Sequence, residues 1–412
     1  MNTLGIVRRF FQILAALVLL CVIGIAALFV SLWVERGRPL TLPSPSGPSS
    51  VGRIVYDWKD DRSTDPLAPT AGTARELLVW IWYPAGIASA PTTDDYVPTY
   101  VKKAVANDTV SPIFKLLTRN LANVHAHSIP NSSITSQEQS HPVLIMRGGA
   151  SAEVWRYSTL AEDLSSHGYV VVGFDAPSRT NLVAFPDGRV ATRLPANNPE
   201  QCFEMSVPKR TECAEKLLGA WTSDISFVLD RLQELNQGNG DVRFTGHLDL
   251  TRVGVFGHSF GGAAALEFCH EDSRCRAVVD IDGAPHGNVI QAGLDRPLMI
   301  LLSDHTHESD PEAHQIMDDL QSIYDRAPSN ARQFIAIRGA NHFLFSDDGA
   351  LLKSHLVMGS LRTVGIVGID GRRQLTVTSY CLRSFFDAFL KGSGNSTFTL
   401  KSPLYPEIQF VR

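Results

Sequence analysis

One pentapeptide, Gly257-His258-Ser259-Phe260-Gly261, constrains the fold of this chain more than any other feature. It joins a short apolar strand to an alanine-rich helical stretch. Gly-x-Ser-x-Gly in that setting is typical of a nucleophile elbow, a sharp turn that exposes its serine. The glycines avoid a clash between strand and helix, and the N-terminus of the helix favours an anion beside the serine. The pattern predicts Ser259 as a nucleophile; an inert serine in a glycine-rich turn is the alternative.

Continuous apolar segments alternate with amphipathic helical segments on both sides of this turn. We expect strands at 77–83, 143–146, 169–174, 253–256, 277–282, 298–302 and 334–337, with helices at 155–167, 217–232 and 377–390. Apolar strands between such helices are typical of a sheet that is covered on both faces. The pattern predicts the α/β-hydrolase fold, with a mostly parallel sheet and helices on both faces.

A serine nucleophile needs a base, and the base needs an orienting acid. Of the 13 histidines, His342 follows the last predicted sheet strand, which is the position expected for the base. Two carboxylates follow earlier strands: Asp282 after the strand next to the elbow, and Asp304 after the following strand. Spacing alone leaves both open as the orienting acid.

The N-terminus carries a 25-residue run without a formal charge, from Phe10 to Val34. At about 1.5 Å per residue, a helix of this length crosses a bilayer. Arg8 and Arg9 precede it and favour a cytoplasmic N-terminus, and Trp33 is expected at the far interface. The run is longer than the apolar part of a cleaved signal peptide. We therefore expect an uncleaved anchor, with the rest of the chain outside the cytoplasm, either periplasmic or extracellular.

These features divide the 412 residues into four parts. Residues 1–9 are a cytoplasmic N-terminus, 10–34 the transmembrane anchor, 35–75 a Pro/Ser-rich tether and entry segment, and 76–412 the catalytic domain. The net charge is −5 and no basic face is evident in the sequence, so nucleic acid is not an expected partner. Two local cysteine pairs, Cys202 with Cys213 and Cys269 with Cys275, are spaced to close small loops in an oxidising compartment.

A metal site is the main alternative use of the polar residues after the strand at 298–302. This segment holds Asp304, His305, His307, Glu308 and Asp310, which are possible metal ligands. A run of this kind after a strand is usually a solvated loop, and a serine mechanism needs no metal. The sequence predicts neither metal nor cofactor.

Several segments together resemble the plasma-type platelet-activating-factor acetylhydrolase family. The resemblance runs from about Arg53 to Leu390 and is carried by Glu76-Leu77-Leu78-Val79-Trp80-Ile81-Trp82-Tyr83-Pro84-Ala85, Ser166-His167-Gly168-Tyr169-Val170-Val171, Gly257-His258-Ser259-Phe260-Gly261-Gly262-Ala263, Asp280-Ile281-Asp282-Gly283 and Asn341-His342-Phe343. The family's nucleophile and base correspond to Ser259 and His342. Its acid corresponds to Asp282 rather than Asp304.

The resemblance implies a calcium-independent esterase that hydrolyses short or oxidised sn-2 acyl chains of phospholipids. The family carries a His-Gly pair after the first core strand, where this chain has Arg147-Gly148. Because the donors to the oxyanion are backbone N–H groups, Gly149 and Phe260 can still supply them. The departure leaves the shape and polarity of the pocket open.

The predicted function is a membrane-anchored serine ester hydrolase that acts on a phospholipid or another small ester. Two alternatives remain open: a dienelactone-hydrolase-like or polyester-cleaving carboxylesterase, and an inactive binding protein with a hydrolase fold. The Ser, acid and His set argues against the inactive protein.

Overall fold

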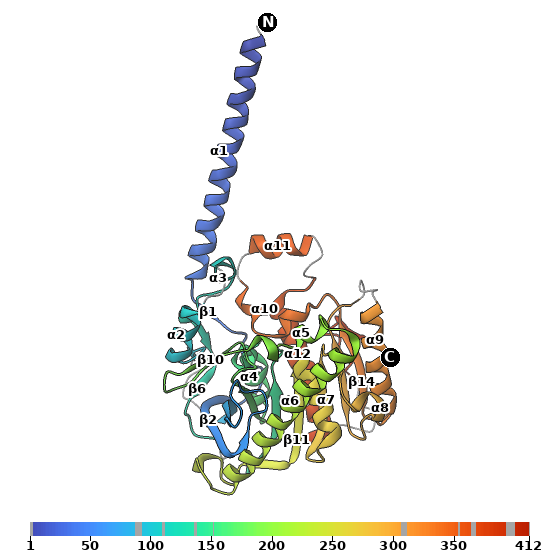
Figure 1. Cartoon of the computed structure of the whole chain (residues 1–412). Helices are drawn as coiled ribbons and strands as arrows, with labels where there is room; N and C mark the ends of the chain where they lie inside the picture. Colours follow the sequence, from blue (N-terminus) through green and yellow to red (C-terminus); the bar gives the residue numbers. More distant parts are fainter. Residues whose placement is uncertain are drawn as a thin grey trace.

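A computed structural model describes residues 3–86, 93–108, 112–135, 138–150, 152–305, 311–352, 355–363, 368–392 and 400–411. A ten-stranded sheet forms the centre of the molecule, in the order β15-β14-β13-β12-β11-β7-β8-β3-β2-β6 (Figure 1). Its strands are β2 (Ser50–Thr64), β3 (Ala74–Ala85), β6 (Ser128–Pro130), β7 (His141–Arg147), β8 (Val170–Asp175), β11 (Leu248–His258), β12 (Cys275–Ile281), β13 (Leu298–Leu302), β14 (Arg332–Ile337) and β15 (Ile408–Phe410).

The sheet is mixed rather than purely parallel, with six of its nine described strand pairs parallel and three antiparallel. The strands from β14 to β8 run parallel to one another. β3 runs antiparallel to both β8 and β2, and β15 runs antiparallel to β14. An apolar run indicates burial on both faces but carries no information about strand direction. β3 is buried along almost its whole length, so its sequence has the same apolar pattern as the sequences of the parallel strands.

Helices cover both faces of the sheet, as predicted. α4 (Ser158–Ser166) and α12 (Gly371–Leu390) contribute buried residues to the core on one face. α6 (Val207–Asn236), α7 (Phe260–Glu271) and α9 (Pro311–Arg326) pack on the other face. The shorter helices are α2 (Thr99–Asn107), α3 (Pro112–Leu117), α5 (Pro199–Phe203), α8 (Val289–Ala292), α10 (Asp348–Leu351) and α11 (His355–Thr363).

The segment expected to be a tether is instead built into the domain. β1 (Leu40–Thr41) pairs with β5 (Val124–Ala126). β2 then forms a long antiparallel ladder with β3. Its N-terminal half is buried or half-buried, whereas most of its C-terminal half is exposed and charged. The many prolines and serines before β2 hid this strand from the sequence pattern.

α1 (Thr3–Arg36) projects away from the domain as a single straight helix (Figure 1). The stretch Val7–Arg36 is long and apolar enough to cross a membrane, and the same composition also fits a signal sequence. Large apolar side chains are exposed along this stretch, including Trp33 with 69 % of its surface exposed. So large an exposed apolar surface is unfavourable in water.

Two disulfides close the local cysteine pairs that the sequence singled out. Cys202 and Cys213 link α5 to α6, and Cys269 and Cys275 link the end of α7 to the start of β12. The second bridge staples the helix that follows the elbow to the neighbouring strand of the sheet. Both bridges fit a chain that folds in an oxidising compartment.

Candidate active site

The elbow between β11 and α7 holds Ser259 in a strained conformation. Its backbone lies at φ 56° and ψ −129°, a region that non-glycine residues rarely adopt. The Ser259 N–H donates to the carbonyl of Ile281 on β12 at 2.8 Å, which ties the turn to the sheet. A Cβ atom on Gly257 would lie 2.0 Å from the Gly261 carbonyl oxygen, so the close approach of strand and helix requires glycine.

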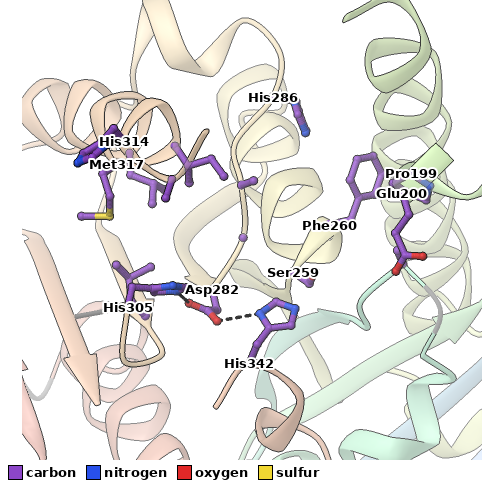
Figure 2. Close-up of a pocket in the computed structure, with 17 residues that line it drawn as sticks. Pro199, Glu200, Ser259, Phe260, Asp282, His286, His305, His314, Met317 and His342 are labelled. Carbon is purple, nitrogen blue, oxygen red and sulfur yellow. Dashed lines mark hydrogen bonds and ion pairs between the residues drawn. The ribbon is translucent and has the colours of Figure 1, made fainter. Parts of the chain in front are cut away.

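Asp282, directly after β12, bonds to His342, which follows β14. His342 Nδ1 lies 2.8 Å from Asp282 Oδ2. In Figure 2 the imidazole lies between the Asp282 carboxylate and Ser259. All three residues line one pocket, so the structure brings together the predicted nucleophile, base and acid.

A second imidazole, which the sequence suggested only as a possible metal ligand, shares the Asp282 carboxylate. His305 Nε2 lies 2.7 Å from Asp282 Oδ1. Ser303 completes the set, because its N–H and its hydroxyl donate to the two carboxylate oxygens at 2.8 and 2.6 Å. Burial opposes ionisation of Asp282, but the hydrogen bonds and charges of His305 and His342 outweigh it and hold its pKa well below the ordinary value.

The predicted oxyanion donors differ in their surroundings. Phe260 is the first residue of α7 and lines the pocket, and an N–H in this position has no acceptor within its own helix. The Gly149 N–H, by contrast, donates to Tyr157 Oη at 3.1 Å. Tyr157 Oη in turn bonds to His258 Nδ1 at 2.8 Å. The buried hydroxyl of Tyr157 therefore accepts the Gly149 N–H, which the sequence assigned as a donor to the oxyanion.

His258 faces this tyrosine, although its ring also lies near the site. The centroids of the His258 and His342 rings are 4.6 Å apart. Burial, with help from the neighbouring His342, lowers the pKa of His258 to about 3. His258 is therefore neutral at ordinary pH and places no second positive charge beside His342.

The side chains of Asp304 and Arg147 both interact with residues outside the pocket. Asp304 Oδ2 accepts the Gly339 N–H at 2.6 Å, in the loop that leads to His342. The Arg147 guanidinium lies between aromatic rings, 4.4 Å from the Phe174 centroid and 4.0 Å from that of Trp221. Neither residue is among those that line the pocket. Replacing the family's histidine by Arg147 thus changes the support behind the site rather than its wall.

Of the candidate metal ligands, the structure describes Asp304 and His305. The Asp304 carboxylate accepts the Gly339 N–H, and the His305 imidazole bonds to the Asp282 carboxylate. His307, Glu308 and Asp310 lie outside the described residues. No group of three or more potential ligands occurs in the part of the chain that the structure describes.

The pocket has a volume of about 320 Å³. One wall comes from α9 and β13 and is largely apolar: Leu302, Ala313, Ile316, Met317 and Leu320. Across from it lie Phe260 and α5, which supplies Pro199 and Glu200 (Figure 2). Sequence reasoning did not anticipate this wall, although the spacing of 313, 316, 317 and 320 is that of one helix face. His305 gave a weaker signal, as a polar residue just beyond a strand.

Three comparisons relate the chain to known proteins. The model of the family described as platelet-activating factor acetylhydrolase, isoform II, matches residues 38–388. A probable 1-alkyl-2-acetylglycerophosphocholine esterase of Arthroderma benhamiae is 27 % identical, over 90 % of this chain and 93 % of that protein. The platelet-activating factor acetylhydrolase of Cavia porcellus is 23 % identical, over 77 % of this chain and 73 % of its own length. A ferulic acid esterase from Streptomyces cinnamoneus shares the fold, with a TM-score of 0.72, 24 % identity, and coverage of 90 % of this chain and 99 % of that one.

Proposed function

Because the chain belongs to the platelet-activating factor acetylhydrolase, isoform II family, a family of carboxylic ester hydrolases, we propose that it cleaves short or oxidised sn-2 acyl esters of phospholipids. The observation that carries the proposal is the Asp282–His342 pair in one pocket with the strained Ser259. A volume of about 320 Å³ is at the low end for small-molecule sites, which span about 300–1,000 Å³. Its apolar wall suits a short acyl chain rather than a long one.

The proposed reaction is acyl transfer through a covalent intermediate. His342 takes the proton of Ser259 as Oγ attacks the ester carbonyl, and Asp282 holds the imidazole through Nδ1 and stabilises the imidazolium. The Phe260 N–H and the helix dipole of α7 stabilise the oxyanion. The proton then passes to the leaving alcohol. A water molecule, deprotonated by His342, hydrolyses the acyl-enzyme and restores Ser259.

We assign the second oxyanion donor to Gly149, in competition with Tyr157. A single N–H can be shared between two acceptors, but each bond is then weaker than an unshared one. Gly149 therefore contributes fully only when Tyr157 Oη moves away from it.

Replacing Ser259 by alanine tests the mechanism. We expect kcat for short acyl esters to fall by several orders of magnitude, because triad members act as a unit. Alanine keeps the Cβ and should leave the elbow intact. Ser223→Ala is the matched control, since Ser223 lies exposed on α6, where its hydroxyl donates to the Gly219 carbonyl. A Ser259→Ala enzyme with a tenth of the wild-type kcat would exclude this serine mechanism.

A substrate panel tests the proposed specificity. We expect sn-2 acetyl phospholipids to be cleaved with a higher kcat/KM than sn-2 palmitoyl phospholipids, because the pocket is small. Equal rates for both would contradict the acyl-length proposal. Labelling of Ser259 by a fluorophosphonate probe separates an esterase from an inactive protein with the same fold.

We further propose that α1 is an uncleaved membrane anchor with a cytoplasmic N-terminus. Arg36 and Arg38 follow the span and balance Arg8 and Arg9, which were the sequence argument for a cytoplasmic N-terminus, so the orientation rests on another observation. The disulfides favour placing the catalytic domain outside the cytoplasm.

A further inference from the structure

The end of α1 is fastened to the domain through backbone carbonyls. The Arg36 side chain donates to the Lys115 carbonyl, and the Arg119 side chain donates to the Glu35 carbonyl. The Asn120 N–H donates to the Arg36 carbonyl at 3.0 Å. The last turn of the proposed span and the segment after α3 thus form one unit, which the span proposed for α1 would place at the membrane interface.

Positive charge accumulates around this junction. Arg36, Arg38, Lys115, Arg119 and Arg372 form what we call the basic collar; Arg38 and Arg372 are close enough to Arg119 to lower its pKa, after the larger effect of burial. Lys115 and Arg372 also donate to backbone carbonyls, at 2.6 Å to those of Asp108 and Thr41.

Carboxylates balance little of this charge. Among the described residues, Glu35 is the one carboxylate in an ion pair with the collar, 3.8 Å from Arg119. Carbonyl oxygens satisfy hydrogen bonds but carry no net charge. The collar therefore keeps a positive potential at the depth where a bilayer has its phosphates.

A cavity of about 630 Å³ opens beside the collar and reaches toward the active site. Arg36, Lys115 and Arg119 line it at the end nearest α1, together with Asp108. Two other cations in its lining are already paired: Lys102 with Asp95 at 2.7 Å, and Arg156 with Glu153 and Asp348. The charge available to a ligand is therefore that of Arg36, Lys115 and Arg119, with the negative charge of Asp108 opposing it.

Much of the remaining lining is apolar, beside the polar Thr118, Asn120 and Asn181, and this apolar part ends next to His342. It includes Val105, Leu121, Leu182, Leu344 and Leu351. Phe343, which directly follows His342, also lines it and has 72 % of its surface exposed. A positive end and a largely apolar wall match an amphiphile with an anionic head. In Figure 1, α3, α10 and α11 lie on the side of the domain from which α1 emerges.

We propose that this cavity binds the phosphate group of a phospholipid from the membrane that α1 spans. Lys115, Arg119 and Arg36 hold the phosphate, and the apolar wall contacts the glycerol and the first acyl carbons. The proposal rests on the span proposed for α1 and not on the esterase reaction. The site is separate from the pocket at Ser259.

The experiment measures thermal unfolding of the full-length protein in dodecyl maltoside, with Ser259→Ala as the background so that no probe is hydrolysed. The probes are dihexanoylphosphatidylglycerol, dihexanoylphosphatidylcholine, dihexanoylglycerol and inorganic phosphate. A ligand of the folded state raises Tm by mass action, by about 3 °C at a hundred-fold excess over Kd. We expect both phospholipids to raise Tm, and dihexanoylglycerol and inorganic phosphate to leave it unchanged.

Three double variants locate the effect. Lys115→Gln/Arg119→Gln should lose the rise in Tm, whereas Lys115→Arg/Arg119→Lys should keep it. Lys59→Gln/Arg276→Gln removes two exposed charges from other surfaces and should also keep it. A rise that survives in Lys115→Gln/Arg119→Gln overturns the proposal.

The probes alone decide the matter if that variant does not fold. An equal rise with dihexanoylglycerol indicates a purely apolar site, and an equal rise with inorganic phosphate indicates a simple anion site. Either result, or no rise with any probe, overturns the proposal. Because the background lacks Ser259, these results are independent of whether the esterase mechanism holds.

Discussion

At the scale of single residues, the Asp282 carboxylate holds the site together through hydrogen bonds to three residues. It accepts hydrogen bonds from Ser303 and faces two imidazoles, those of His342 and His305. Its backbone, like that of Ser259, has a positive φ, here 55°. Two neighbouring strands thus end in strained residues that point their functional atoms into one pocket.

The two carboxylates that the sequence could not separate should differ sharply on substitution. Asp282→Asn is expected to lower kcat about a thousand-fold or more with little change in KM, because the orienting charge matters most when the imidazolium forms. Asp304→Asn should cost less than about ten-fold, since the amide oxygen can still accept the Gly339 N–H. Steady-state kinetics, with Tm as the folding control, check both. An inactive Asp304→Asn beside an active Asp282→Asn would reverse the assignment.

Tyr157→Phe tests the competition for the Gly149 N–H. Removing the hydroxyl frees this N–H for the oxyanion, so kcat should equal or exceed that of the wild type. Stability should fall by about 1–3 kcal/mol, because His258 Nδ1 is left buried without its partner. Denaturant unfolding and esterase kinetics on one preparation give both numbers. A ten-fold loss of kcat in a folded variant would instead assign a catalytic role to the hydroxyl.

At the scale of elements, Asp347 ties the start of α10 to two distant parts of the fold. Its carboxylate accepts the Tyr96 hydroxyl at 2.8 Å and the Thr159 N–H of α4 at 3.1 Å. Burial raises its pKa to about 7, despite these two hydrogen bonds. The folded state therefore binds a proton that the unfolded state, with a carboxyl pKa near 3.8, has already released.

This difference predicts a pH dependence of stability. Between about pH 4 and 7 the folded state holds more protons at this group than the unfolded state, so its contribution to stability is lost as the pH rises. Asp347→Asn has no such proton, and its stability should fall less over this interval. Tm measured at half-unit steps of pH for both proteins checks the difference. Parallel curves would contradict a raised pKa for Asp347.

The central parallel elements could be predicted because their physical causes are local. The strands that became β7, β8, β12, β13 and β14 are short apolar runs, and the elbow has its own sequence pattern. β6 and β15 have three residues each and carry too few apolar side chains to show a period. Strand direction and the pairing of β2 depend on long-range contacts, which no local pattern records.

The same division applies to the site. The placement of Ser259 and His342 in one pocket could be predicted because each follows a strand in a fixed chain order. The contacts of His305 and Tyr157 arise when loops from different strands meet, so their partners are invisible in one sequence. The sequence also could not separate Asp304 from Asp282 by spacing, since both follow strands whose ends meet at the same edge of the sheet.

At the scale of the whole molecule, the proposed anchor makes a direct prediction. The full-length protein should stay in the membrane pellet after carbonate extraction at high pH, because the exposed apolar surface of α1 has no place in water. Sequencing the N-terminus of the mature protein provides the control. A new N-terminus after Ala27 or later, with the protein in the supernatant, would show a cleaved signal instead.

The junction between α1 and the domain has a further consequence. The last turn of α1 shares hydrogen bonds with the segment around α3. The described residues between α1 and the domain therefore do not form a flexible linker on which the domain could reach a second vesicle. An enzyme anchored in this way would meet only substrate molecules that diffuse within its own membrane. Its rate would follow the mole fraction of substrate in its own leaflet, and diluting the membranes into more buffer would leave that rate unchanged.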